Sequence, residues 1–542
     1  MRMMKIIVAI VIFAAIAGGV YVLTGGPSVR HGGPASSAVP ATGVFPQDVS
    51  DLPEAKPTPE ITLQDGETYD VGIFPVKKKI GDTWVRMLSY NGSVPGPVFR
   101  VKEGAEATIR LKNDGDLETT LHSHGLRLEN LFDGVPGVTQ EPIKVGDTFE
   151  YRLKFSDPGM YWYHPHVRTD YGLEAGLYGT YIVDPTDAGY WPKANRELSL
   201  TLDDIALGKD GRPLSFDRGE TDHTLMGRFG DTMFVNGETD YRFAAAPGEV
   251  VRLYLVNTAN VRPFDFTIPG AKMKLVGADL GRYARETFVE SVMLSPGERR
   301  VVDVLFGMPG EFPIEHRTPE KRYALGSVSV SGSPIAVSYA EEFAALRENR
   351  AVAEEMNPLF GEYLSKAPDK KLDLTLAMGG MMGAPSGMHR MSGGGMMEDA
   401  MMGMGDDGET IEWEDEMAAM NTGSTTKTLT WKLRDAATGK ENMRIDDWKF
   451  KVGDKVKIRI FNDSSSMHPM QHPIHFHGQR FVVLSTNGVR NADPVWQDTT
   501  LLPKGETVDI LLELTNPGEW MAHCHIVEHA EAGMMMTFSV EK

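Results

Sequence analysis

The sequence predicts an all-β fold made of three Greek-key β-sandwich domains. Short segments rich in β-branched and apolar residues alternate with Gly, Pro, Asn and Asp, and no long stretch of the predicted sandwiches has a helical period. Strands of similar pattern recur at 107–111, 250–257 and 455–462, each after a glycine-containing turn. Because 542 residues are too many for one core, this internal repeat predicts three similar domains.

We expect the three sandwiches to span residues 56–187, 188–335 and 336–542. The third would carry an insertion rich in Gly and Met at 378–420. A helix-like stretch at 340–366 would connect the second domain to the third.

The N-terminus indicates export. A basic start is followed by an uncharged apolar run from residue 6 to about residue 23, so residues 1–26 are predicted to be a signal peptide or an N-terminal membrane anchor. Either would deliver the protein to the periplasm or the outer face of the membrane. Residues 27–55 are rich in Gly, Pro, Ser and Ala and predict a flexible linker.

The composition excludes one class of partner and favours another. The formal net charge is −20 at pH 7, so we expect no nucleic acid partner, because phosphates demand a basic face. An acidic surface favours cations, although it is more often a solubility feature. The single cysteine allows no internal disulfide bond. In an exported protein such a cysteine is better explained as a metal ligand than as a free thiol.

That cysteine lies in a group of metal-ligand residues near the C-terminus. Cys524 is flanked by His523 and His525, and His529 and Met534 follow. A thiolate, imidazoles and a weak axial thioether are the ligands of a blue-copper electron-transfer site. If residues 520–525 form a strand, Cys524 points to one face and its neighbouring histidines to the other. One strand end would then serve two metal sites.

Histidines repeat at the spacing of a strand in the first and third domains. Ten of the 15 histidines fall into four clusters: 122 and 124; 164 and 166; 472, 475 and 477; 523, 525 and 529. In each His-x-His pair the two imidazoles share one face of an extended chain. His472 has the opposite parity from His475 and can serve a different metal. One such pair is weak support, but several together predict a multinuclear metal centre.

With these motifs the chain closely resembles the three-domain multicopper oxidases, the family of laccases and bacterial cuprous oxidases of the copper-resistance type. The likeness runs from about Asn91 to the C-terminus and includes residues 91–97 and 133–140 on either side of the first histidine pair. It implies cupredoxin-like domains and four copper ions. The ligands would be His472, Cys524, His529 and Met534 for the type 1 copper; His122 and His475 for type 2; and His124, His164, His166, His477, His523 and His525 for the type 3 pair.

The resemblance also implies the reaction. A reducing substrate gives single electrons to the type 1 copper, and a trinuclear cluster reduces dioxygen to water with four electrons. Asp133 aligns with the aspartate that relatives use beside the type 2 copper and is the predicted proton donor. Many bacterial relatives carry a glutamate where this chain has Ala530, so Glu531, one position later, is a second candidate.

The methionine-rich stretch is the main clue to the substrate. Thioethers without competing hard ligands suit Cu(I), and so much Gly and Met cannot build a packed core. The alternative is a disordered surface insertion or an apolar flap. By resemblance, His468 and Met470 would bind substrate copper. Further candidates are Asp406, Asp407, Glu412, Glu414 and Met417.

Three functions fit these observations. The first is oxidation of Cu(I) in copper tolerance, and the second is a laccase-like oxidation of phenols or other organic donors. The third is a copper-binding scaffold, storage or delivery protein without activity. The complete set of copper ligands argues against the third. If residues 1–26 are an anchor, they attach the protein to the membrane. No feature of the sequence indicates an oligomeric state.

Overall fold

The structure is a computed structural model that describes residues 43–378, 388–390, 396–398 and 410–542. All described residues belong to one compact unit. The predicted signal peptide or anchor, residues 27–42 of the predicted linker and most of the methionine-rich insertion lie outside the described residues. Within the described ranges, no helix combines the length and the apolar character needed to cross a membrane.

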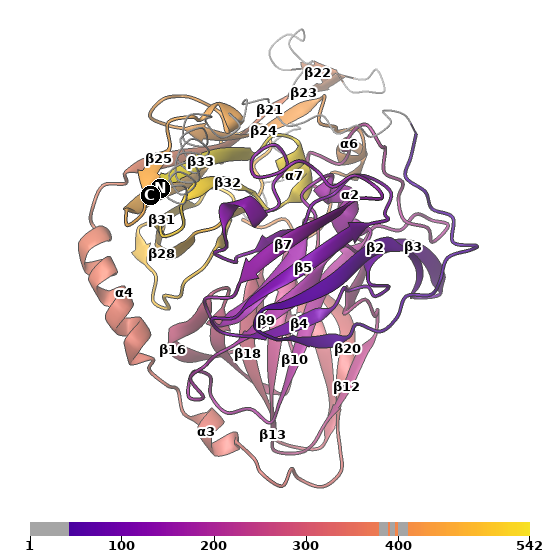
Figure 1. The fold of residues 1–542 in the computed structure, drawn as a ribbon, viewed down its shortest axis with the longest axis vertical. Coiled ribbons are helices and arrows are strands. Elements are labelled where there is room, and N and C mark those ends of the chain that lie inside the picture. Colours follow the sequence, from indigo (N-terminus) through magenta and orange to yellow (C-terminus); the bar gives the residue numbers. More distant parts are fainter. Residues whose placement is uncertain (1–42, 379–387, 391–395, 399–409) are drawn as a thin grey trace, which may run out of the picture. The chain divides into compact units, whose positions relative to one another are not determined.

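The first part of the chain forms two facing sheets (Figure 1). Their strand orders are β1-β4-β9-β8-β6 and β3-β2-β5-β7. The strands are β1 (Glu60–Leu63), β2 (Glu67–Ile80), β3 (Thr83–Tyr90), β4 (Val98–Lys102), β5 (Glu106–Asn113), β6 (His122–His124), β7 (Thr148–Lys154), β8 (Gly159–His164) and β9 (Gly179–Asp184). The turn η1 (Asn130–Phe132) and helix α2 (Thr169–Glu174) interrupt them.

The middle part repeats this arrangement with the sheets β11-β10-β13-β18-β15-β16 and β12-β20-β19-β14-β17. Its strands are β10 (Arg196–Ile205), β11 (Thr232–Val235), β12 (Tyr241–Ala245), β13 (Glu249–Asn257), β14 (Phe264–Thr267), β15 (Lys272–Ala278), β16 (Gly281–Val289), β17 (Val292–Leu294), β18 (Arg299–Phe306), β19 (Gly310–Arg317) and β20 (Arg322–Val330). The helix-like stretch that follows contains α3 (Ala340–Ala344) and α4 (Arg350–Tyr363).

The last part forms the sheets β24-β21-β26-β31-β28-β29 and β25-β33-β32-β27-β30 and a small pair β22-β23. Its strands are β21 (Lys370–Met378), β22 (Met388–Arg390), β23 (Met396–Glu398), β24 (Leu429–Asp435), β25 (Lys449–Lys451), β26 (Lys455–Asn462), β27 (His472–Phe476), β28 (Arg480–Thr486), β29 (Val489–Arg490), β30 (Thr499–Leu502), β31 (Thr507–Glu513), β32 (Gly518–Cys524) and β33 (Met535–Glu541). Three short helical elements, α6 (Ala418–Thr422), η2 (Asn442–Arg444) and α7 (Val527–Glu531), lie between them. The predicted all-β fold class is confirmed, whereas the domain boundaries stay a prediction.

Two strands show how the residue pattern decides burial. In β5, Ala107, Ile109 and Leu111 are buried and alternate with more exposed residues, as expected for a strand with one face on the core. In β13 all nine residues are buried. One face, with Leu253, packs in the core of its own sandwich, and the other, with Tyr254, packs against Trp162 and other residues of the first sandwich. The packing between sandwiches therefore explains why this strand lacks polar alternation.

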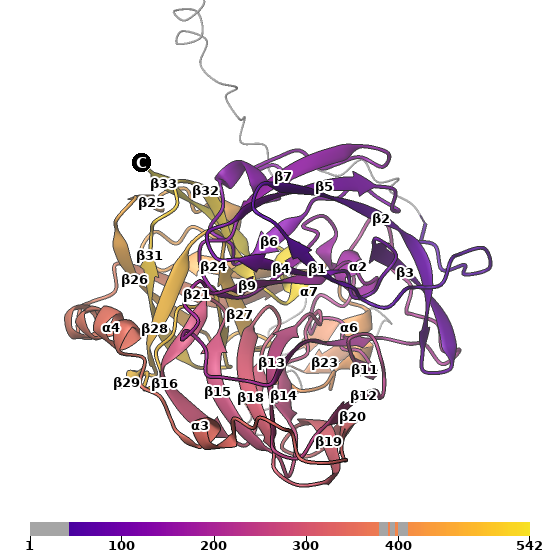
Figure 2. The ribbon, with the colours of Figure 1, turned by 60° about the horizontal axis from the view of Figure 1, so that its bottom comes forward.

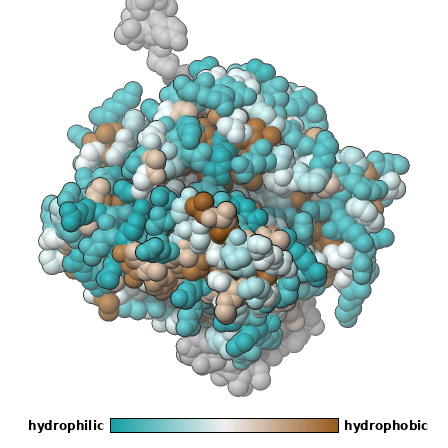
Figure 3. Space-filling model, turned by 90° about the horizontal axis from the view of Figure 1, so that it is seen from below, coloured by the Kyte–Doolittle hydropathy of each residue, from teal (hydrophilic) through white to brown (hydrophobic). Residues whose placement is uncertain are grey.

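The outer surface is mostly hydrophilic on the face shown in Figure 3, where apolar side chains form small patches between polar ones. Helix α4 lies beside β28 of the third sandwich (Figures 1 and 2). Met356 and Phe360 of this helix are buried in the same cluster as Val482 and Leu484 of β28. The connector between the second and third sandwiches is thus itself packed against the third.

Part of the predicted flexible linker is a packed segment. Phe45 is 2% exposed, its ring stacks on Tyr171 at 3.7 Å between ring centres, and its backbone N–H donates to Phe216. The guanidinium of Arg218 lies 4.6 Å from the ring of Phe45. The sequence analysis predicted a flexible linker from its Gly, Pro, Ser and Ala content and did not identify Phe45 as a buried residue. Through it, residues 43–55 tie the first sandwich to the segment that follows β10.

Replacing Phe45 tests this packed segment. We expect Phe45→Ala to lower the free energy of unfolding by about 3 kcal/mol, because it removes a buried ring and its contact with Arg218. Val44→Ala is the matched control, since Val44 is the adjacent residue and is exposed. Thermal unfolding followed by circular dichroism measures both. Equal unfolding midpoints would mean that the segment adds nothing to stability.

Candidate metal centres

Strand pairing brings the predicted histidines of each sandwich together. In the first sandwich, β6 pairs with β8 so that His122 is opposite His164. In the third, β27 pairs with β32 so that His475 is opposite His523. The two pairs meet between the first and third sandwiches, where the rings of His124 and His475 are 3.7 Å apart. Figure 2 labels β6 and β27 in this region. Two halves of one cluster therefore come from opposite ends of the chain.

All eight histidines predicted for the type 2 and type 3 coppers meet in one cluster. Histidines of the two sandwiches face each other at ring-centre distances of 3.7 Å for His124–His475, 4.0 Å for His122–His477, 5.2 Å for His166–His523 and 5.5 Å for His164–His525. Three groups within it have ligand atoms within 4.8 Å of one another: His122, His475 and His477; His122, His124 and His164; and His166, His477 and His523. Seven of the eight side chains are buried, and His166 is half-buried.

The other predicted ligands form a second, separate group. Cys524 Sγ lies 3.6 Å from His472 Nδ1 and 3.9 Å from His529 Nδ1, and these two nitrogens are 3.3 Å apart. Met534 is fully buried beside them. Its carbonyl accepts the N–H of Cys524, and its own N–H donates to the carbonyl of His529. The indole of Trp431 in β24 covers both imidazoles, with ring-centre distances of 4.9 Å to His472 and 4.2 Å to His529.

The end of β32 joins the two groups. Cys524 points into the hydrophobic core of the third sandwich, whereas its neighbours His523 and His525 lie in the histidine cluster. His523 Nδ1–H donates to the carbonyl oxygen of Cys524 at 2.7 Å. The alternation of side chains along a strand thus separates the thiol from the adjacent imidazoles.

Two imidazole nitrogens of the histidine cluster, those of His477 and His523, point at each other. His477 Nδ1 bonds to a carboxylate oxygen of Asp133 and His523 Nδ1 to a carbonyl, and since both oxygens can only accept, each Nδ1 carries the hydrogen. The two Nε2 atoms, 3.0 Å apart, therefore oppose their lone pairs. Such an arrangement is repulsive unless a cation binds there. It fits a metal site.

Unpartnered nitrogens support the same conclusion. Buried polar atoms normally have hydrogen-bond partners. Seven ring nitrogens of this cluster find none among the described residues: His122 Nε2, His124 Nδ1, His164 Nε2, His166 Nε2, His475 Nε2, and both nitrogens of His525. In His122, His164 and His475 the other nitrogen donates to a backbone carbonyl, which leaves Nε2 as a free ligand. The donor set of imidazoles, thiol and thioether is one that binds copper.

Burial keeps these groups in defined protonation states. Burial, aided by neighbouring histidines, lowers the pKa of His166 and of His472 to about 3, so both imidazoles are neutral near pH 7. Neutral imidazole is the form that binds metals. Burial also raises the pKa of the Cys524 thiol, which therefore stays protonated until a metal ion stabilises the thiolate.

Asp133 and Glu531, the predicted proton donors, lie in different places. Asp133 follows η1, and its carboxylate accepts His477 Nδ1–H at 2.9 Å while its carbonyl accepts His122 Nδ1–H at 2.8 Å. Its other carboxylate oxygen is 3.3 Å from His122 Nδ1. Glu531 ends α7 and packs against α2, where its carboxylate accepts the backbone N–H of Thr169 at 3.0 Å. Asp133 is therefore in contact with the histidine cluster, and Glu531 bonds to the first sandwich elsewhere.

Sequence reasoning missed a second buried carboxylate in the cluster. Asp498 accepts hydrogen bonds from His124 Nε2–H at 3.0 Å and, through its carbonyl, from His475 Nδ1–H at 2.9 Å. Arg299 of β18 binds the same carboxylate with both Nη atoms and is itself fully buried. Burial alone would raise the pKa of Asp498, but Arg299 and His124 hold it well below its ordinary value. No local pattern marked Asp498, because His124 and Arg299, which bind its carboxylate, come from two other sandwiches.

Gly125, which follows the first His-x-His pair, makes room for this ion pair. Its φ is +87°, and a Cβ there would lie 2.4 Å from an oxygen of Asp498 and 2.7 Å from a nitrogen of Arg299. Both the backbone conformation and the close approach require glycine. The glycine after His124 is thus explained by a contact with the second and third sandwiches.

The residues predicted for substrate copper are only partly brought together. Met470 is fully buried in the core of the third sandwich, and its carbonyl accepts an N–H of Asn462. His468 Nε2 instead lies 2.8 Å from the sulfur of Met226, a residue that the sequence analysis did not single out. Of the further candidates, Glu414 pairs with Lys321; Glu412 bonds through its backbone to Gln471; and Met417 packs on the core of the third sandwich. Asp406 and Asp407 lie outside the described residues.

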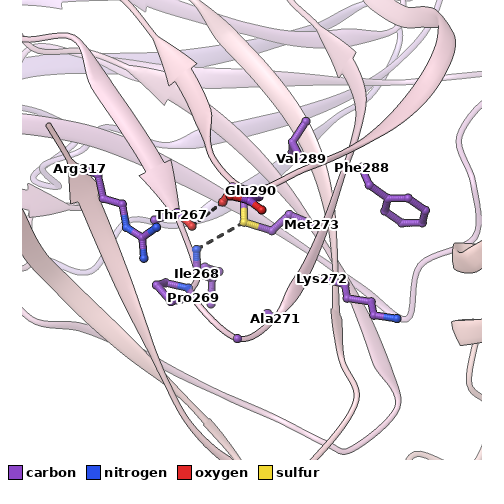
Figure 4. A pocket seen from close by; sticks show the side chains of 11 residues that line it. Thr267, Ile268, Pro269, Ala271, Lys272, Met273, Phe288, Val289, Glu290 and Arg317 are labelled. Carbon is purple, nitrogen blue, oxygen red and sulfur yellow. Dashed lines mark hydrogen bonds between the residues drawn. The ribbon is translucent and has the colours of Figure 1, made fainter. Parts of the chain in front are cut away.

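A cavity of about 540 Å³ lies elsewhere, in the second sandwich (Figure 4). It is lined by the turn between β14 and β15 and by parts of β16 and β19, including Lys272, Glu290 and Arg317. The lining contains no histidine or cysteine. This cavity is therefore separate from both metal-ligand groups.

Bacterial multicopper oxidases are among the solved structures with a similar fold. A laccase-like multi-copper oxidase CueO from Ochrobactrum sp. aligns with a TM-score of 0.66 at 22% identity, covering 90% of this chain and 100% of that one. A multicopper oxidase from Campylobacter jejuni, described as a metallo-oxidase, aligns with a TM-score of 0.64 at 21% identity, covering 92% and 99%. These likenesses confirm the cupredoxin-like fold.

Relatives in sequence include both predicted kinds of enzyme. A laccase of Arthroderma benhamiae is 29% identical over 82% of this chain and 72% of its own length. The multicopper oxidase MmcO of Mycobacterium tuberculosis is 27% identical over 85% and 84%. Copper resistance protein A of Escherichia coli is 24% identical over 88% and 93%.

Three family models match the chain, each described as multicopper oxidase. They cover residues 76–188, 205–324 and 415–542, which together make up more than half of the sequence. Each match covers most of one of the three β-sandwiches, and the first and third contain the predicted copper ligands. The protein therefore belongs to the multicopper oxidases, a family of copper-dependent oxidoreductases.

Proposed function

We propose that this multicopper oxidase oxidises Cu(I) and passes the electrons to dioxygen, as an enzyme of copper tolerance. The observation that supports Cu(I) as the substrate is the place where the methionine-rich segment joins the sheet. Met378, the last described residue before most of this segment, ends β21 opposite Leu429, which begins β24 two residues before Trp431. Trp431 covers His472 and His529. The methionine-rich sequence is thus joined to the strand that pairs with the strand of Trp431, and thioethers favour Cu(I).

The proposed copper ligands are those of the two groups. The type 1 copper would be held by His472, Cys524, His529 and Met534; the type 2 copper by His122 and His475; and the type 3 pair by His124, His164, His166, His477, His523 and His525. When bound, four copper ions supply one-electron acceptance at the first centre and four-electron reduction of dioxygen to water at the second. The paired strands and the second partners of the imidazoles support this assignment.

The chain itself supplies orientation, insulation and a connection. Hydrogen bonds from the Nδ1 atoms of His122, His164 and His475 to carbonyl groups fix their rings and direct Nε2 inward. Complete burial of Cys524 keeps water from its sulfur. Because Cys524 adjoins His523 and His525 in the chain, only a few covalent bonds separate the two centres.

We assign proton transfer to Asp133. Its carboxylate contacts His477 and lies close to His122, so it reaches both kinds of predicted ligand. A positioned carboxyl group can hand protons to a reacting oxygen. Glu531 stays a second candidate for proton transfer. Its carboxylate accepts the backbone N–H of Thr169. Export through residues 1–26 also stays a prediction.

The second candidate function is a laccase-like oxidation of phenols or other organic donors. The observation that favours it is the laccase of Arthroderma benhamiae among the relatives. Both functions use the same copper ligands. They differ in what the methionines do, because a phenol gains nothing from a thioether donor.

Oxygen consumption by the copper-loaded protein, with Cu(I) and with a phenol, decides between these functions. The test variant replaces the nine methionines of residues 379–409 by leucine, which keeps length and apolar character. For a Cu(I) oxidase we expect at least a tenfold fall in kcat/KM for Cu(I) and little change for the phenol. If wild type consumes no oxygen with Cu(I), the laccase-like function replaces the proposal.

Cys524→Ser tests the division into two centres. Serine offers no thiolate, so we expect the bound copper to fall from four ions to three and the intense visible absorption of a copper thiolate to vanish. The histidine cluster should keep its copper. Metal analysis and absorption spectroscopy measure both effects. Loss of all copper would contradict two independently occupied centres.

Asp133→Asn tests the proton donor. We expect kcat to fall by about a hundredfold, because proton delivery by a positioned acid is lost. Copper content should not change, since Asp133 is not a proposed ligand. Glu129→Gln is the control, as Glu129 is an exposed acid four residues earlier. A kcat within twofold of wild type would remove Asp133 from the mechanism.

Gly125→Ala tests the buried ion pair behind His124. The added methyl group would strike Asp498 and Arg299, and we expect a loss of about 3 kcal/mol of stability together with copper from the histidine cluster. Gly146→Ala is the matched control, because Gly146 has φ +92° with no atom near its Cβ, and it should lose only about 1 kcal/mol. Unfolding midpoints and metal analysis are the measurements. Equal losses in both variants would show that backbone strain alone matters.

A further inference from the structure

A buried threonine lies beside two of the predicted copper ligands. Thr499 begins β30 and is fully buried. The pairing of β27 with β30 puts it opposite His475, and the pairing of β27 with β32 puts His523 on the other side of His475. The ring of His124, from the first sandwich, stacks on the ring of His475 with 3.7 Å between ring centres and 17° between ring planes. The threonine therefore lies next to a stacked pair of rings that two sandwiches contribute.

The hydroxyl of Thr499 has three polar partners in this region. Its Oγ1 lies 2.8 Å from Asp498 Oδ1, 3.1 Å from His124 Nε2 and 3.2 Å from His475 Nδ1. Each ring nitrogen also has a second partner. His124 Nε2 is 3.0 Å from Asp498 Oδ1, and His475 Nδ1 is 2.9 Å from the carbonyl oxygen of Asp498. Asp498 and Thr499 together thus hold one nitrogen of each ring.

Counting hydrogens gives each of these bonds a direction. Arg299 binds the carboxylate of Asp498 with both Nη atoms, and this carboxylate only accepts. The hydroxyl hydrogen of Thr499 therefore points at Asp498 Oδ1, and His124 Nε2 carries a hydrogen. His475 Nδ1 also carries one, because its other partner is a carbonyl. Both N–H groups then donate to the hydroxyl oxygen, whose one donor and two acceptor sites are all used.

These bonds leave one free nitrogen on each ring. His124 Nδ1 and His475 Nε2 are buried and find no hydrogen-bond partner among the described residues, so both are available to a metal. Each held N–H group is shared between two acceptors, one from Asp498 and one from Thr499. Two acceptors restrict the tilt of a ring more closely than one. The hydroxyl therefore helps to set the angle at which both rings present their free nitrogens.

We infer that Thr499 is a positioning residue, whose hydroxyl holds His124 and His475 at the mutual angle that copper binding needs. The inference rests on the copper ligands proposed above. There His475 is one of only two protein ligands of the type 2 copper, whereas His124 is one of six for the type 3 pair. The type 2 copper therefore depends most on this hydroxyl. Loss of the outer partner of a metal-binding histidine weakens metal binding by about 10- to 100-fold.

The opposing explanation is that Thr499 only satisfies buried polar groups and so stabilises the fold. Thr499→Val separates the two explanations, because it keeps the shape of the side chain and each ring N–H keeps an acceptor in Asp498. If Thr499 is a positioning residue, the metal-free protein should unfold within about 3 °C of wild type while copper binding weakens. A purely structural role predicts the reverse, a lower unfolding temperature with copper retained.

The experiment uses the full copper-loaded chain with Thr499→Val and with Thr499→Ser, which restores the hydroxyl. Thr500→Val is the matched control, because Thr500 is the next residue of β30, is also buried and lies opposite Ile474, on the other face of the sheet. Competition with a chelator measures copper affinity, and electron paramagnetic resonance identifies the type 2 copper. The visible absorption of the Cys524 thiolate with copper is the internal reference for the type 1 centre.

We expect Thr499→Val to weaken retention of the type 2 copper at least tenfold and to alter its resonance signal, with the type 1 absorption unchanged. Thr499→Ser should return the affinity to within about threefold of wild type, and Thr500→Val should match wild type. Wild-type affinity in Thr499→Val, an equal loss in Thr500→Val, or no recovery with serine would overturn the inference.

Failure of the proposed function gives a different result. A wild-type protein without a type 2 resonance signal would overturn the proposed copper ligands and this inference with them. If the expected pattern is found in a protein that consumes no oxygen with Cu(I), the positioning role of Thr499 stands and Cu(I) is not the substrate.

Discussion

Both metal-ligand groups depend on the pairing of β27 with β32. This register sets His475 opposite His523 and Ile474 opposite Cys524. Alternation along β32 then directs Cys524 into the core of the third sandwich and leaves its neighbours in the histidine cluster. A shift by one residue would exchange the two faces and break both groups together. A single strand register therefore fixes the separation and the connection of the two centres.

The second sandwich supplies no predicted copper ligand, yet it sets the surroundings of both groups. Arg299 from β18 neutralises Asp498 beside the histidine cluster. Leu225 bonds to His529 in the other group. Strand β13 packs with one face on the first sandwich, which explains its complete burial. The second sandwich thus places the guanidinium of Arg299 next to one group of predicted ligands and the carbonyl of Leu225 next to the other.

The sequence alone predicted what depends on local spacing. Paired histidines two residues apart had to share a face, and Cys524 had to point away from its neighbours, because strand geometry has a period of two. Asp498, Arg299 and Met226 could not be found this way. Their contacts join residues 199 and 242 positions apart, and no local pattern encodes a contact between sandwiches. The anchor at Phe45 was missed because its neighbours have the composition of a linker.

The division of the histidine cluster between β6 and β8 near one end of the chain and β27 and β32 near the other has a consequence for biosynthesis. The first four imidazoles emerge from the ribosome long before their partners. Until His525 has been made and the third sandwich has folded, the four histidines of the first sandwich can bind a metal ion only weakly. A prematurely terminated product would therefore retain half a site and no oxygen chemistry. The histidine cluster therefore requires the complete chain through β32.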